Sequence, residues 1–133
     1  MVYDTSISKP IGESHPLKPV SPYAASKLAA EELAFAYYHA YGLPVVVTRP
    51  FNTYGPYQKS NMEGGVVSIF LKRDLEGKPL LVFGDGKQTR DLLYVEDCAD
   101  FIVRAAFEKA AIGEVINAGS GKDISINDLA ILI

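Results

Sequence analysis

The stretch that decides the fold is SPYAASKLAAEELAFAYYHAYGLPVVVTR at residues 21–49, where a helical pattern is followed by a strand pattern. Ser21 is a helix-capping residue, the proline after it suits the first helical turn, and Gly42 is a common residue just past a helix end. A helix is therefore predicted over residues 22–41. Its apolar positions at helical spacing are Ala25, Leu28, Ala29, Leu33, Ala36, Tyr37 and Ala40. The run at residues 45–48 is apolar on both faces, which is typical of a strand buried in a parallel sheet.

The rest of the chain continues the alternation of helix and strand. Three more helices are predicted, over residues 64–76, over residues 96–109 and after Ser125. The inward positions expected in the second of these are Phe101, Ile102, Ala105 and Ala106. Three more strands are predicted, over residues 80–83, 92–95 and 113–117. Gly84-Asp-Gly is a tight turn of the kind that hairpins favour, and residues 1–20, 51–58 and 118–121 are rich in turn residues. This alternation indicates the α/β fold class.

Composition narrows the classes of function. The chain has 133 residues, 48% of them hydrophobic and 22% charged, which suits one globular domain with a core. A net charge of −3 argues against a nucleic-acid or anionic-membrane partner, because both select a basic face. No apolar run approaches the roughly 20 residues of a membrane span, and the N-terminus lacks a signal-peptide pattern, so a cytoplasmic location is expected.

Cysteine and histidine usage gives no metal-site pattern. Cys98 is the only cysteine, so it forms no internal disulfide, and apolar residues at helical spacing favour a buried packing role over catalysis. His15 and His39 are isolated, and no metal is expected.

Tyr23 and Lys27 are the strongest chemical clue. Four residues apart on the predicted helix, they fall on one face. A cation held beside a phenol favours its anion, which makes tyrosine a proton-transfer group. The spacing alone leaves a second interpretation open, in which the two residues are neighbours on a solvated helix face.

Two glycine-rich turns raise the question of phosphate binding. Neither Gly84-Asp-Gly nor Gly119-Ser-Gly extends to a dinucleotide fingerprint, and a plain loop is favoured for the second. Arg90 follows the first turn and either reaches a bound diphosphate or forms a salt bridge with Asp91 or Glu96.

These segments, in this order, resemble the extended short-chain dehydrogenase/reductase family, specifically its NAD-dependent nucleotide-sugar epimerases and dehydratases. The resemblance covers nearly the whole chain. It is carried by Val2-Tyr3, Glu13, Ser-Pro-Tyr-Ala-Ala-Ser-Lys at 21–27, Arg-Pro-Phe-Asn-Thr-Tyr-Gly-Pro-Tyr-Gln at 49–58, Gly-Asp-Gly-Lys-Gln-Thr-Arg-Asp at 84–91, Tyr-Val-Glu-Asp at 94–97 and Asn-Ala-Gly-Ser-Gly at 117–121.

The resemblance implies a role for each matching residue. Tyr23 would be the acid/base for a sugar hydroxyl, and Lys27 would hold the nicotinamide ribose of NAD and lower the Tyr23 pKa. Pro50 would lie near the nicotinamide. The implied nucleotide-sugar residues are Asn52 at the phosphates, Leu81 and Phe83 around the base, and Arg90 on the diphosphate. For Phe83 the alternative is a plain core aromatic. Asp91 and Asp97 would be architectural, positioning Arg90 and the following helix.

The resemblance also shows what residues 1–133 do not contain. The family's Gly-rich half that binds the NAD pyrophosphate is missing, as is the Ser or Thr expected before Val2. The expected fold is thus a partial Rossmann-like parallel sheet plus a smaller α/β substrate-binding part. The chain is expected to be one C-terminal portion of an epimerase/dehydratase domain.

Two descriptions of function remain open. One is part of a nucleotide-sugar epimerase or 4,6-dehydratase, and the other is an inactive nucleotide-sugar-binding or complementation fragment that needs a separate NAD-binding half. Unpaired strand edges predict self-association as a homo-oligomer. The helix at residues 22–41 matches one that contributes to the family's dimers.

Overall fold

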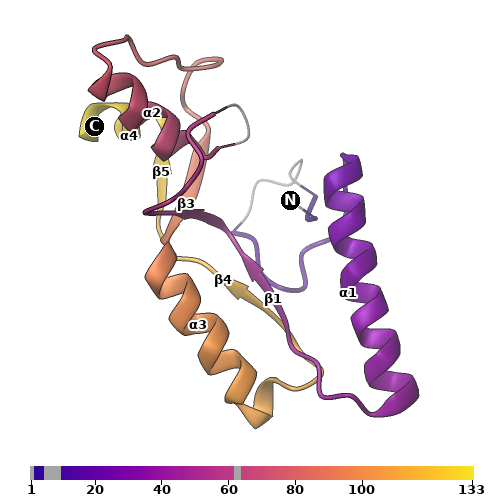
Figure 1. Cartoon of the computed structure of the whole chain (residues 1–133). Coiled ribbons are helices and arrows are strands. Elements are labelled where there is room, and N and C mark those ends of the chain that lie inside the picture. The colour runs from indigo at the N-terminus through magenta and orange to yellow at the C-terminus, as the bar shows by residue number, and fades with distance from the viewer. Residues whose placement is uncertain (1, 5–9, 62–63) are drawn as a thin grey trace. The chain divides into compact units, whose positions relative to one another are not determined.

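The computed structural model describes residues 2–4, 10–61 and 64–133. The elements follow in the order α1, β1, β2, α2, β3, α3, η1, β4, β5 and α4 (Figure 1). They fall into two compact units: the first ends at Arg49 and resumes over 104–117, and the second comprises 50–103 and 118–133. The mixture of helices and short strands confirms the α/β class.

Helix α1, Pro22–Tyr41, has the two ends that the sequence predicts. The Ser21 hydroxyl accepts a hydrogen bond from the Ala24 N–H at 3.1 Å. Gly42 adopts a left-handed φ of 67° and donates its N–H to the Tyr38 carbonyl at 2.9 Å. Both ends are therefore set by local chemistry.

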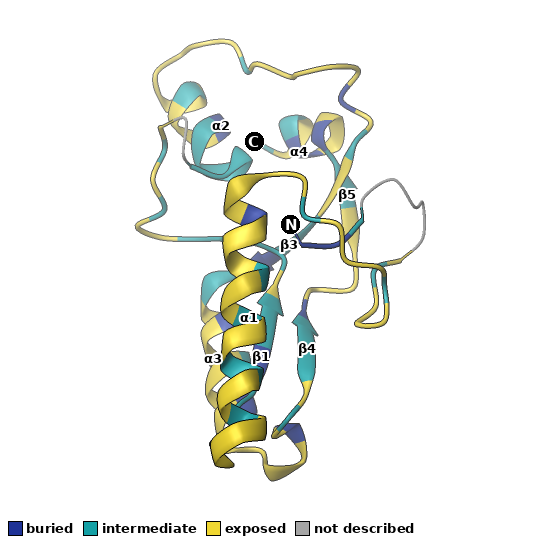
Figure 2. Ribbon diagram, turned by 90° about the vertical axis from the view of Figure 1, so that its right-hand side faces the viewer, coloured by how far each residue is buried: buried dark blue, intermediate teal, exposed yellow. Residues whose placement is uncertain are grey.

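The face that α1 buries differs from the apolar pattern of its sequence. Ala24 is fully buried, and the partly buried positions are Leu28, Glu31, Ala34, Phe35 and Tyr38. Of the apolar positions noted in the sequence, Leu28 alone is partly buried, and the others are exposed. Figure 2 shows that most of α1 is exposed. Alanines lie on every side of α1, so the apolar pattern of its sequence does not single out one face. The face that is partly buried includes the carboxylate of Glu31.

Strands β1, Val47–Pro50, and β4, Val115–Ala118, pair in a two-stranded sheet. The Val47 N–H donates to the Glu114 carbonyl at 3.0 Å. Both predicted strands are confirmed, although β1 begins two residues later than expected. The short 3-10 helix η1, Lys109–Ala111, precedes β4, and Tyr3 forms an isolated antiparallel bridge with Leu17.

The sheet of the second unit is built around β3, Thr89–Tyr94. Its later half runs parallel to β2, Asn52–Tyr54, and its earlier half runs antiparallel to β5, Asp123–Ser125. The sequence predicts β3, three residues shorter at its start, but places β2 in a turn-rich segment and predicts no strand at β5. Each of these two strands has three residues and exists through its pairing with β3.

Helices α2, Val66–Leu75, and α4, Ile126–Leu132, enclose one core of the second unit. Its buried residues are Phe70, Ile126 and Leu129. Ser125 caps α4 by accepting the Asp128 N–H at 3.0 Å, which confirms the predicted cap. The cap and the burial of Ile126 and Leu129 place α4 where its sequence pattern predicts a helix.

Helix α3, Val95–Phe107, contributes to a second core with its Cys98 side. Cys98 packs with Leu93, Ala118 and Phe101, so its predicted burial is confirmed. Ile102 is 42% exposed and Ala106 is exposed, which corrects their expected inward position. Cys98 and Ala105 are buried and Phe101 is half-buried, so these three residues define the inner stripe of α3. Ile102 and Ala106 each come one residue later, which turns their side chains about 100° away from that stripe.

The strand predicted at residues 80–83 is wrong. This segment has no strand assignment, and Leu81 and Phe83 are 51% and 81% exposed. Leu80 alone packs partly against the Phe70 core. The following turn is present, with φ of 74° at Gly84 and 70° at Gly86, but it joins no hairpin. Within the described part of the chain, no helix is long and apolar enough to cross a bilayer.

Candidate active site

Helix α1 brings the predicted pair Tyr23 and Lys27 together in the first unit. The Lys27 Nζ lies 5.4 Å from the centroid of the Tyr23 ring, within the range of a cation–π contact. Tyr23 is 68% exposed, so its phenol is accessible. The Ser26 hydroxyl donates to the Tyr23 carbonyl at 2.8 Å in the same turn. The pair thus presents a proton-carrying hydroxyl and three N–H donors on one accessible helical turn.

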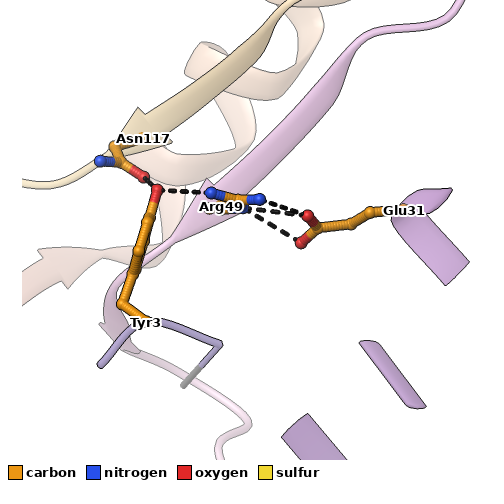
Figure 3. A network of polar contacts seen from close by, with 4 residues as sticks. All are labelled: Tyr3, Glu31, Arg49 and Asn117. Carbon is orange, nitrogen blue, oxygen red and sulfur yellow. Dashed lines mark hydrogen bonds and ion pairs between the residues drawn. The ribbon is translucent and has the colours of Figure 1, made fainter. Parts of the chain in front are cut away.

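A polar network in the same unit joins residues from four parts of the chain (Figure 3). Arg49 of β1 holds Glu31 of α1 by Nη2–Oε2 at 2.6 Å and by Nε to both carboxylate oxygens, at 3.1 and 3.2 Å. Its Nη1 donates to the Tyr3 hydroxyl at 2.8 Å, which in turn donates to Asn117 Oδ1 at 2.6 Å. The Arg49 and Glu31 side chains are only 10% and 13% exposed.

Arg49 keeps its charge despite this burial. Desolvation works against the guanidinium, but the hydrogen bonds to Glu31 and Tyr3 outweigh it and raise the pKa of Arg49 above its ordinary value. The sequence marks Arg49 as the end of a strand and as the first residue of a family motif, but predicts no role for its side chain. The sequence signal that could have pointed to this network is Glu31, because it continues the four-residue spacing of Tyr23 and Lys27 along α1.

The five predicted residues other than Tyr23 and Lys27 lie in the second unit. Pro50 ends β1 and is exposed, and the Asn52 side chain donates to the Asp91 carbonyl at 3.2 Å. Leu81 and Phe83 are exposed on the segment before the Gly84 turn. Asn52 and Arg90 lie on adjacent strands, since β2 pairs with β3, and Arg90 is exposed.

Asp91 has a different task from the one predicted. Its carboxylate accepts hydrogen bonds from the Ser120 N–H and hydroxyl, both at 2.8 Å, and from the Gly121 N–H at 3.0 Å. Both oxygens are thus engaged by the loop at 120–121, and Arg90 instead donates to the Thr89 carbonyl at 2.7 Å. A Cβ at Gly119 would lie 2.7 Å from Asp91 Oδ2, so this glycine is required for packing.

A cavity of about 340 Å³ lies elsewhere in the second unit. Its lining is largely apolar, from α2, β3, β5 and α4, with Tyr54, Ser120 and Lys122 among its polar members. It includes none of the predicted residues Pro50, Asn52, Leu81, Phe83 and Arg90. The hollow is thus separate from the candidate substrate residues. In the described ranges, no cluster of His, Cys, Asp and Glu is suited to a metal ion.

Comparison with known proteins identifies the class of this chain. Residues 1–119 match the model of the NAD dependent epimerase/dehydratase family. The chain belongs to this family, as its motifs predict. Its α/β fold, with a partial Rossmann-like sheet, agrees with the structures of family members.

Individual relatives include both kinds of enzyme. A putative UDP-glucose 4-epimerase of Methanocaldococcus jannaschii is 40% identical over 96% of this chain and 41% of its own length. A dTDP-glucose 4,6-dehydratase of Xanthomonas campestris is 41% identical over 84% of this chain and 30% of its own length.

Two solved structures are similar to the chain in three dimensions. Pal from Bacillus thuringiensis has a TM-score of 0.93 and 62% identity, covering 99% of this chain and 42% of its own. UDP-glucuronic acid 4-epimerase from Bacillus cereus, in complex with UDP-glucuronic acid and NAD, has a TM-score of 0.85 and 41% identity, covering 96% of this chain and 40% of its own. The chain therefore spans 30% to 42% of the length of these four proteins.

Proposed function

We propose that this chain is the part of an NAD-dependent nucleotide-sugar epimerase or 4,6-dehydratase that carries the acid/base tyrosine and the substrate residues. The observation that carries the proposal is the contact between Lys27 and Tyr23 on an exposed turn of α1. Relatives named as epimerases and as 4,6-dehydratases support both forms of the reaction.

In this proposal Tyr23 removes a proton from a sugar hydroxyl and returns it later. Lys27 carries a fixed positive charge beside the phenol and has N–H donors to spare for ribose hydroxyls. The exposed Pro50 would flank the nicotinamide. The Tyr23 hydroxyl and the Lys27 ammonium fit the nicotinamide ribose end of NAD, which supplies hydride transfer when it is bound. No residue of the chain is proposed for the pyrophosphate, because both glycine turns are explained by packing and turn geometry.

The nucleotide-sugar is assigned to the second unit. Arg90 is exposed and its planar guanidinium suits a diphosphate, while exposed Leu81 and Phe83 suit a base. Phe83 is too exposed for the alternative role of a core aromatic. Asn52 Nδ2 carries two N–H groups, and one of them donates to the Asp91 carbonyl, so the other is available to donate to a phosphate oxygen.

The absence of a dinucleotide fingerprint from residues 1–133 favours a second candidate, a nucleotide-sugar-binding or complementation module. With NAD and UDP-glucose supplied, these residues alone are then expected to show no turnover. Turnover that appears only with a co-expressed NAD-binding half would identify the complementation module.

Self-association is also proposed. Leu33, Tyr37 and Tyr41 are 60%, 49% and 78% exposed on α1, and a second copy would cover them.

Thermal-shift and calorimetric titration of the chain with UDP-glucose, dTDP-glucose and NAD tests the proposed function. A ligand that binds only the folded chain raises its melting temperature. A nucleotide-sugar is expected to raise it, and Arg90→Ala is expected to abolish that rise, whereas Lys109→Ala, an exposed charge in η1, is the matched control. The substrate assignment would be contradicted if no nucleotide-sugar raised the melting temperature, or if Arg90→Ala and Lys109→Ala reduced that rise equally.

Tyr23→Phe tests the acid/base assignment where the NAD-binding half is present. Loss of turnover with retained nucleotide-sugar binding is expected. Tyr41→Phe, on the same helix and 78% exposed, should leave turnover unchanged. Retained turnover in Tyr23→Phe would refute the assignment.

A further inference from the structure

Three residues with chemistry recur along one stripe of α1. Tyr23, Lys27 and Glu31 are spaced by four, so each lies roughly 40° around the helix from the one before. A lysine and a glutamate at this spacing normally attract each other across one helical turn. Glu31 is therefore a competitor of Tyr23 for the Lys27 ammonium.

The structure removes that competitor. Both Glu31 oxygens are engaged by Arg49, whose Nε and Nη2 make three contacts of 2.6 to 3.2 Å with them. The Lys27 ammonium lies instead over the Tyr23 ring, at 5.4 Å from the centroid. The carboxylate and the ammonium of the stripe thus have separate partners.

Arg49 is itself held in place from the other side. Its Nη1 donates to the Tyr3 hydroxyl, whose proton goes to Asn117 Oδ1, and Asn117 Nδ2 donates to the Ile11 carbonyl. This directed series of hydrogen bonds fixes the orientation of the Asn117 amide and of the guanidinium together. Arg49 therefore meets Glu31 in one orientation, with little freedom to release it.

We propose that Arg49 is a positioning residue for the candidate active site: by capturing Glu31, it withholds that carboxylate from Lys27 and leaves Lys27 to act at Tyr23. This role rests on the proposed function of the Tyr23–Lys27 pair. It also explains why the inner face of a sparsely buried helix contains an acidic residue. An arginine suits the task because its planar fork engages both oxygens of the carboxylate.

Removal of Arg49 should redirect Lys27. In Arg49→Met the Glu31 carboxylate is left nearly buried without its cation, a strongly unfavourable state that Lys27 relieves by turning toward it. In the double variant Arg49→Met/Glu31→Gln the charge is gone, and Lys27 should return to Tyr23. If the Lys27–Tyr23 contact returns in the double variant, Arg49→Met acted by freeing Glu31 to compete for Lys27. General damage to the fold would not be repaired by Glu31→Gln.

The measurement is NMR spectroscopy of the chain, with the cross-relaxation between Lys27 ε protons and Tyr23 ring protons and the upfield ring-current displacement of those protons as readouts. Both signals are expected in wild type and Glu31→Gln, lost in Arg49→Met and restored in the double variant. Signals that persist in Arg49→Met, or that remain lost in the double variant, would overturn the proposal. Circular dichroism checks that each variant is folded.

A second pair of variants leaves the buried network intact and serves even where Arg49→Met does not fold. Ala30→Glu places an uncaptured carboxylate three residues after Lys27, on the face it shares, at an exposed position. Ala29→Glu adds the same charge two residues away, where the side chains do not face each other. The first should weaken the Lys27–Tyr23 signals and the second should not; equal effects or no effect would refute competition by a carboxylate.

These readouts need no NAD, substrate or turnover. A failed NMR prediction therefore removes the role of Arg49 and leaves the Tyr23 assignment standing. A failed Tyr23→Phe prediction removes the proposed function, whatever the NMR result.

Discussion

Two glycines of the Gly84-Asp-Gly turn provide a matched pair for a stability measurement. Both have left-handed backbones, with φ of 74° at Gly84 and 70° at Gly86. A Cβ at Gly84 would meet open space, whereas a Cβ at Gly86 would overlap the Asn127 side-chain oxygen. Substituting alanine at either position incurs the left-handed penalty of about 1 kcal/mol. Only Gly86→Ala must also displace a neighbour.

The displaced neighbour makes a hydrogen bond that sets the size of the difference. Asn127 Nδ2 donates to the Asp85 carbonyl at 2.9 Å. Because the Asn127 side chain can rotate, the overlap at Gly86 costs about the value of that bond, roughly 1 kcal/mol. Gly84→Ala should therefore lower the free energy of unfolding by about 1 kcal/mol and Gly86→Ala by about 2 kcal/mol.

Urea unfolding monitored by circular dichroism would measure these values in the two single variants, in Asn127→Ala and in Gly86→Ala/Asn127→Ala. If the overlap acts through the hydrogen bond, Gly86→Ala and Asn127→Ala remove the same bond, and the double variant should be about 1 kcal/mol more stable than the sum of the single changes predicts. Equal losses for Gly84→Ala and Gly86→Ala, or strict additivity in the double variant, would refute the assignment of the extra loss to Asn127.

Three further outcomes follow from local contacts. Ser125→Ala removes the cap of α4 and should lower stability by about 1 kcal/mol, with faster hydrogen exchange at the Asp128 amide; unchanged exchange would contradict the cap. The hydrogen bond from the Asn117 N–H lowers the pKa of Glu13 below its ordinary value of 4.5. Its stabilising contribution is therefore present above pH 4.5 and lost as the pH falls through the lower folded value, so Glu13→Gln should flatten the fall of stability on the acid side of pH 4.5, and an unaltered fall would argue against it. Leu33→Glu, at a position 60% exposed on α1, should shift sedimentation toward the monomer, and an unchanged profile would exclude that face from self-association.

Elements whose ends depend on nearby residues could be predicted from the sequence. Ser21 and Gly42 fixed both ends of α1, and Ser125 fixed the start of α4, because each cap bonds within one turn. Strands β2 and β5 could not be found this way, since three residues have no periodicity of their own and pairing with β3 defines them. The apolar run at residues 80–83 shows the converse, a strand pattern without a partner strand.

The same distinction applies to the candidate site. The contact between Tyr23 and Lys27 follows from their spacing on a helix. Arg49 was missed because its partners Glu31 and Tyr3 are distant in sequence, and no local pattern marks a guanidinium that joins separate segments. Asp91 was assigned to Arg90 next to it, but the fold gives its carboxylate to the loop at 120–121.

The two-sided pairing of β3 has a consequence for folding kinetics. Asn52 pairs with Leu92, and Arg90 pairs with Ile124, so both partners come from distant parts of the chain. Helices α2 and α4 form from local contacts, whereas the sheet must first close long loops at an entropic cost. The helices of the second unit are thus expected before its sheet in the folding order. The encounter of three strands at β3 becomes the slow step, and substitutions in this strand should alter the folding rate as well as the final stability.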